Sequence, residues 1–176
     1  DEDVTIGEIT VEFTDGDAEI SRLDLALTGS DAWDAFDTIT LWVDGEKVAE
    51  VDASDEDNYL DEDAGELRFA GLDIVAMEDE ELEITVAASV QNNLDAAELG
   101  DWELFAIAVR YFDAEGVSTT EDDQDDLSDD ETTPFTGEPS ASFEVGEEGE
   151  EDELTVRSST SDPEATTLQL EDDSKS

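Results

Sequence analysis

The chain has 176 residues, of which 37% are hydrophobic, and 56 Asp and Glu against 6 Lys and Arg give a formal net charge of -50. This charge repels nucleic acid, anionic lipid and heparin-like polymers, so we exclude them as partners. The absence of cysteine and histidine excludes disulfides, zinc sites and histidine-based catalysis. No apolar run approaches the length of a membrane-spanning helix, so no membrane insertion is expected.

The first two predicted strands cover residues 4–13 and 20–27, where apolar and polar side chains alternate. Gly7 interrupts the alternation of the first strand and indicates a β-bulge. Asp15 and Gly16 form the dipeptide that two-residue hairpin turns favour. We therefore predict that the two strands pair as a hairpin.

The clearest local pattern is the run ITLWVDGEKVAEV at residues 39–51. It combines alternating apolar residues with a central Asp44-Gly45 turn, so it predicts a second β-hairpin. Similar runs lie before and after it. We expect neighbouring strands to assemble on this hairpin and to place it in the middle of a sheet.

Further strands are predicted at residues 67–69, 82–90 and 102–112. Residues 71–77 are interpreted as a turn that carries apolar side chains, Val75 among them, into the interior. The run 102–112, WELFAIAVRYF, is apolar on both of its faces. This pattern is typical of a central strand that is covered on both sides.

These elements predict an all-β fold, an immunoglobulin-like or jelly-roll β-sandwich with additional C-terminal strands. Residues 1–115 form the sandwich domain in this interpretation, and residues 116–137 form an acidic linker. Residues 138–176 supply three short strands with too few apolar residues for a core of their own. These strands must pack on the first domain or on a neighbouring subunit.

Two acidic clusters are candidate cation sites, because Ca²⁺ prefers several carboxylate oxygens in one loop. The first cluster follows the spacing of a calcium-binding loop and consists of Asp55, Asp57, Asp61, Asp63 and Glu66. Leu60 stands where such a loop needs glycine, so it is no EF-hand, and a solvated acidic loop is the alternative reading. The second cluster lies in the run EDDQDDLSDDE and includes Asp122, Asp123, Asp125 and Asp126.

Salt and Ca²⁺ remain alternative means of neutralising the charge. At about 1 M salt the Debye length falls to about 3 Å, which screens neighbouring carboxylates from each other. Acidic residues on the outer face of every predicted strand favour a saline environment. The four basic residues in predicted strands, Arg22, Lys47, Arg68 and Arg110, are each expected to pair with carboxylates on an outer face.

No catalytic pattern is present. The sequence contains no G-x-S-x-G nucleophile motif and no glycine-rich phosphate loop. With 56 acidic residues, the proximity of two carboxylates does not indicate a glycosidase pair. We therefore expect a protein that is not an enzyme.

The runs GEITVEFTDGDAEISRLDLALTG and FDTITLWVDGEKVAEVDASDEDNY resemble modules of tandem-repeat acidic Ig-like β-sandwich surface and fibre proteins of uncultivated bacteria and halophilic microbes. The resemblance covers most of residues 1–112 and extends to SFEVGEEGEEDELTVRSSTSDPEATTLQLEDD near the end. It implies an extracellular or cell-surface structural role and supplies no catalytic residues. The start at Asp1 rather than Met fits a secreted product that has lost its signal peptide, or one module of a longer protein.

The resulting hypothesis is a subunit of an extracellular filament or surface layer. Copies of the chain are joined by β-strand donation and stabilised by Ca²⁺ or high salt. The alternative is a secreted adhesin or carbohydrate-binding β-sandwich module, which needs Trp33, Trp42 and Trp102 to form an exposed aromatic platform. The apolar neighbours of these tryptophans favour core packing instead.

Overall fold

The computed structural model describes residues 3–92, 94–122, 139–147, 154–158 and 167–170. One sheet, sheet A, contains β1 (Val4–Phe13), β3 (Phe36–Val43), β4 (Glu46–Asp52), β7 (Glu81–Val90) and β12 (Thr167–Leu170). The other, sheet B, contains β2 (Ala18–Thr28), β5 (Tyr59–Asp61), β6 (Glu66–Ala76), β8 (Gly100–Phe112), β9 (Ser118–Asp122), β10 (Ala141–Glu147) and β11 (Leu154–Ser158). The helical elements are α1 (Ala32–Ala35) and the 3-10 turn η1 (Glu56–Asn58).

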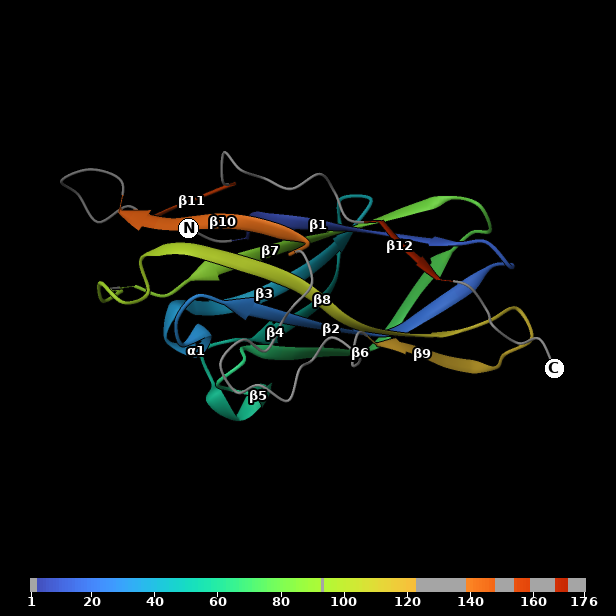
Figure 1. The fold of residues 1–176 in the computed structure, drawn as a ribbon, viewed down its shortest axis with the longest axis horizontal. Helices are drawn as coiled ribbons and strands as arrows, with labels where there is room; N and C mark the ends of the chain where they lie inside the picture. Colours follow the sequence, from blue (N-terminus) through green and yellow to red (C-terminus); the bar gives the residue numbers. More distant parts are fainter. Residues whose placement is uncertain (1–2, 93, 123–138, 148–153, 159–166, 171–176) are drawn as a thin grey trace.

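The strands form two stacked sheets whose long strands run along the longest axis of the molecule (Figure 1). The order of sheet A is β12-β1-β7-β3-β4, and that of sheet B is β11-β10-β8-β2-β6-β5, with β9 paired to β8 as well. The prediction of an all-β sandwich is therefore confirmed. No helix in the described ranges has both the length and the apolar character to cross a membrane.

The core lies between the sheets, where the apolar face of each strand is turned inward. Three large aromatic residues join the layers: Phe36 from sheet A, and Trp102 and Phe143 from sheet B, all nearly inaccessible to solvent. The ring of Phe36 meets Trp102 edge to face with 4.9 Å between centroids, and Phe143 with 6.2 Å. Such edge-to-face pairs add stability beyond the area that they bury.

The predicted hairpin at Asp15-Gly16 is wrong. β1 belongs to sheet A and β2 to sheet B, so the chain crosses the sandwich at this turn instead of folding back within one sheet. Both strands turn an apolar face to the shared interior, β1 from one layer and β2 from the other. The bulge predicted at Gly7 is confirmed by a register shift between Thr5 and Gly7 in the pairing of β1 with β7.

The hairpin predicted at residues 39–51 is confirmed as β3 and β4. Asp44 and Gly45 both have positive φ, 52° and 79°, as a type I′ turn requires. The expected place in the middle of a sheet is wrong, because β4 is an edge strand. Its exposed charges, Glu46, Lys47 and Glu50, are typical of an edge that resists further strand pairing.

Two further expectations need correction. Residues 66–76 form one continuous strand, β6, and Val75 points outward with 58% of its surface exposed. Its neighbours Leu72 and Ile74 are buried as predicted. The first part of the range 116–137, predicted as a linker, contains strand β9. β9 forms because residues 118–122 pair with the edge of β8 between Ala108 and Phe112, beyond the part of β8 that pairs with β10.

Strands beyond residue 138 complete both sheets. β10 pairs with the first part of β8, and β12 pairs with β1. The middle of β8 is buried on both faces, as its sequence predicts, because Phe105 and Ile107 form a second small apolar cluster with Ala26 on the side away from the main core. Glu103 and Arg110 on either side of this cluster are exposed.

Candidate functional site

The first predicted cation cluster lies on the loop that joins β4 to β6. Asp55 and Asp61 use their carboxylates to shape this loop: Asp55 accepts a hydrogen bond from the backbone N–H of Asp57 at 3.1 Å, and Asp61 accepts one from Ala64 at 3.1 Å. Asp63 is exposed. Glu66 is half-buried at the start of β6 and pairs in register with Asp61.

These side chains share one loop but do not converge. Within the described ranges, no three acidic residues are arranged around a common point in a manner suited to a metal ion. Two of the five predicted ligands instead support a 3-10 turn and a tight turn, so each would keep only part of its oxygen donors for a cation.

The loop carboxylates nevertheless repel one another. Glu56 is the main cause of a raised pKa at Glu62, followed by burial and by Asp63, Asp61 and Asp57. At Glu66, burial raises the pKa first, and Asp61 and Asp24 add to the effect, while Arg68 opposes it. Screening by salt or neutralisation by a cation relieves this repulsion.

The second predicted cluster lies almost wholly outside the described residues. Asp122 is the last residue of β9. Asp123, Asp125 and Asp126 lie outside the described residues.

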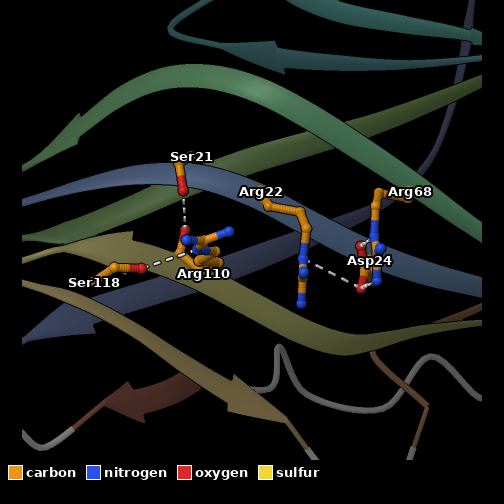
Figure 2. Close-up of polar contacts among 6 residues, drawn as sticks. All are labelled: Ser21, Arg22, Asp24, Arg68, Arg110 and Ser118. Atoms are coloured by element: carbon orange, nitrogen blue, oxygen red, sulfur yellow. Dashed lines mark hydrogen bonds and ion pairs between the residues drawn. The ribbon is translucent and has the colours of Figure 1, made fainter.

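The densest polar arrangement that the structure describes was not predicted as a site. It lies on the outer side of sheet B, where Arg22, Arg68 and Arg110 gather on three neighbouring strands (Figure 2). We call this surface the arginine face. Asp24 lies within it, and its neighbours Leu23 and Leu25 point into the core.

Asp24 is 3% exposed and is held by Arg68. The Arg68 guanidinium donates two hydrogen bonds, from Nε to Oδ1 at 2.9 Å and from Nη2 to Oδ2 at 2.8 Å. This fork-shaped arrangement is the strongest geometry for an arginine–carboxylate pair. The bonds to Asp24 also raise the pKa of Arg68.

Arg22 and Arg110 are less well satisfied. Arg22 Nε approaches Asp24 Oδ2 at 3.5 Å but is buried without a hydrogen-bond partner. Arg110 donates from Nε to the Ser118 hydroxyl at 2.9 Å, and Figure 2 shows its side chain directed to that serine. Among the described residues, Arg110 makes no ion pair. In the described part of the chain, the expected pairing of basic residues with carboxylates is confirmed for Arg22, Lys47 and Arg68 but is not seen for Arg110.

The three tryptophans do not form a platform. Trp102 is 1% exposed and donates from its indole nitrogen to the Glu98 carbonyl at 3.0 Å. Trp33 packs against the core from the α1 segment. Trp42 is half-buried on sheet A and donates to the Thr40 hydroxyl at 2.9 Å. Core packing is therefore confirmed for Trp102 and Trp33.

A hollow of about 20 Å³ lies at the turn between β1 and β2, lined by Phe13, Tyr111 and several acidic residues. Its volume is close to that of a single water molecule and too small for a sugar ring.

No protein-family model, curated protein or solved structure matches this chain. The functional interpretation therefore depends on the geometry and the charge of the molecule itself.

Proposed function

We propose that this chain is a structural subunit of an extracellular filament or surface layer, in which the 167–170 strand of one copy pairs with β1 of the next. The observation that carries this proposal is the pairing of β12 with β1. The two strands run parallel, with Thr10 to Phe13 in register with Thr167 to Leu170. Every other strand pair in the described part of the chain is antiparallel.

A strand in this position can be exchanged between copies. β12 is the edge strand of sheet A, and its ladder contacts are with β1 alone. Strand addition at an edge depends on main-chain hydrogen bonds, which a neighbouring copy supplies as well as the chain itself does. Subunits that exchange an identical strand assemble through the same contacts that hold the strand within a single chain.

The charge of the chain sets the conditions for assembly. Two copies that each carry a formal charge of -50 repel one another strongly unless salt screens them or Ca²⁺ binds them. Within each copy, the carboxylates around Glu62 in the loop between β4 and β6 also repel one another. Assembly in a saline or calcium-containing extracellular medium is consistent with both features.

Cysteine cross-linking tests the proposal, because the chain has no cysteine of its own. Glu12 and Gln169 are partners in the β1–β12 register, and paired strand positions are close enough for a disulfide. Glu12→Cys and Gln169→Cys are made as separate single variants, mixed at high salt and oxidised. We expect a disulfide-linked heterodimer on a non-reducing gel.

The matched control is Val48→Cys mixed with Gln169→Cys, because Val48 is exposed on β4 at the opposite edge of sheet A. This pair should cross-link only at background level. If the Glu12 and Gln169 variants cross-link only when both substitutions are in the same chain, the strand is not donated and the proposal fails.

A further inference from the structure

Cationic side chains are scarce in this chain, and half of them are on one surface. Of its 6 Lys and Arg, Arg22, Arg68 and Arg110 form the arginine face of sheet B. The rest of the sequence is dominated by 56 acidic residues. The arginine face therefore gathers three of the few cations of the chain on one surface.

Arg22 and Arg110 are direct partners in the β2–β8 register. Like charges placed directly opposite each other on antiparallel strands destabilise the pair. Asp24 offsets this repulsion only in part, because both of its oxygens accept hydrogen bonds from Arg68 and Arg22 Nε approaches Oδ2 only at 3.5 Å. With Glu66, which lies close enough to Arg68 to add to the rise that Asp24 causes in its pKa, three arginines face two carboxylates, and the group keeps an excess of one positive charge.

The hydrogen-bond donors point to the same conclusion. A guanidinium has five N–H donors in a planar fork that matches a carboxylate. The Arg22 side chain makes no hydrogen bond to another described residue, and because its Nε is buried, only its terminal nitrogens can meet an incoming group. Arg110 is exposed and donates from Nε to Ser118, while its terminal nitrogens make no ion pair with any described residue. Two neighbouring guanidinium groups thus keep donors available for an incoming carboxylate.

We propose that Arg22 and Arg110 form a carboxylate-binding site that receives an Asp or Glu side chain of a second copy of this chain. The site lies on the outer side of a sheet, which suits a segment of another protein surface better than a small molecule. Charge complementarity identifies the partner, because every copy presents acidic residues in excess. Screening by salt removes the long-range repulsion between copies, while short-range paired contacts persist.

This inference rests on the proposed self-assembly, but it concerns a different surface from the β1–β12 edge. Phenylglyoxal reacts with free guanidinium groups, so its rate of reaction tests contact at the arginine face separately from pairing at the β1–β12 edge. Assembled and dispersed protein are treated in parallel, and each arginine is quantified by mass spectrometry. We expect Arg22 and Arg110 to react about tenfold more slowly in the assembled protein.

Arg68 is the internal control, because Asp24 already occupies its fork in each copy, and its reactivity should be equal in both states. If assemblies form and Arg22 and Arg110 remain as reactive as in the dispersed protein, the inference is wrong while the proposed function stands. If free glutamate protects them to the same extent in the dispersed protein, the source is a small carboxylate and the assignment to a second copy is overturned.

Substitution provides an independent measurement. Arg110→Gln removes the more exposed cation, and Arg22→Gln/Arg110→Gln removes both. We expect the double variant to require at least about tenfold more protein to assemble at the same salt concentration. Lys47→Gln, which removes one cation from the edge of sheet A, should assemble as the unmodified chain does. Equal assembly of the double variant and Lys47→Gln would overturn the inference.

Discussion

Arg22 and Arg110 are opposite one another on β2 and β8, while the one buried carboxylate beside them, Asp24, gives both of its oxygens to Arg68. Two like charges are thus in contact positions within a protein that has nine acidic residues for every basic one, to the nearest whole number. Two of only 6 basic residues are direct partners across two strands. This arrangement leaves donors on the outer side of sheet B, where the proposed assembly would place an acidic side chain of a second copy.

The Asp24–Arg68 pair should contribute strongly to stability. Asp24→Asn removes the negative charge of a buried side chain that both Arg68 and Arg22 contact. We therefore expect the free energy of unfolding to fall by about 2–3 kcal/mol. Urea unfolding at about 1 M salt, where exposed charges are screened, measures the change. The control is Glu50→Gln, which breaks the exposed pair with Lys47 at 2.7 Å and should have a much smaller effect. Equal losses would contradict the account.

Gly7 is required by the close approach of β1 to β10. A Cβ atom at Gly7 would lie 2.6 Å from the Cβ of Ala141 and 2.9 Å from Cδ2 of Leu104. Gly7→Ala should therefore lower the free energy of unfolding by about 1–3 kcal/mol through overpacking. Gly146→Ala in β10 meets no atom within 4 Å and should be neutral or slightly stabilising. A harmless Gly7→Ala would show that the two sheets are not packed as described.

Tyr59 should make stability sensitive to alkaline pH. Its hydroxyl donates to the Ala53 carbonyl at 2.8 Å, and burial, with a smaller contribution from Asp52, raises its pKa. Tyr59→Phe should cost about 1 kcal/mol at pH 7. Because the folded pKa is above the unfolded value of about 10, the unfolded state loses its proton first, and this stability declines as pH rises beyond that value. The difference in free energy of unfolding between the unmodified chain and Tyr59→Phe should therefore narrow above about pH 10. A difference that does not change with pH would contradict this prediction.

Glu62 should destabilise the protein at low salt. Its pKa is raised chiefly by Glu56, so the stability that protonated Glu62 provides is present below its unfolded pKa and is lost as pH rises to 7. Glu62→Gln should raise the melting temperature at pH 7 in dilute buffer, and the gain should shrink at about 1 M salt. Glu83→Gln, an exposed acid on β7, changes the net charge equally and should give a smaller gain. Equal gains would assign the effect to net charge alone.

Local turns could be predicted from the sequence, but the pairing of strands could not always be. Asp44 and Gly45 both adopt positive φ and join two strands of one sheet. Asp15-Gly16 has the same dipeptide, yet of these two residues only Gly16 has positive φ, 125°, and the chain crosses to the other sheet there. The dipeptide permits a hairpin turn. Which sheet receives the next strand depends on long-range packing that a local pattern does not contain.

The arginine face shows the same limit for the candidate site. The alternation of Leu23, Asp24 and Leu25 predicts that Asp24 points away from the core. Its partner Arg68 is 44 residues away along the chain, and the contact depends on the register of β2 with β6. The same holds for Arg22 and Arg110, which meet only through the β2–β8 register. A single sequence contains no signal for that register.

The spacing of acidic residues predicts where the acidic loop lies but not the conformation that it adopts. The positions of Asp55, Asp61 and Glu66 suit a calcium loop, but Asp55 and Asp61 accept backbone hydrogen bonds that form local turns. Short Asp side chains bond their own backbone readily, and this competes with the gathering of oxygens around an ion.

The most direct measurement is the mass of the particle by light scattering at about 1 M salt, repeated with Ca²⁺ and then with a chelator. The account predicts large assemblies in salt or Ca²⁺, and smaller particles when the salt is removed and the cation is chelated. A monomer of 19.1 kDa under every condition would contradict the proposed subunit of a filament or surface layer.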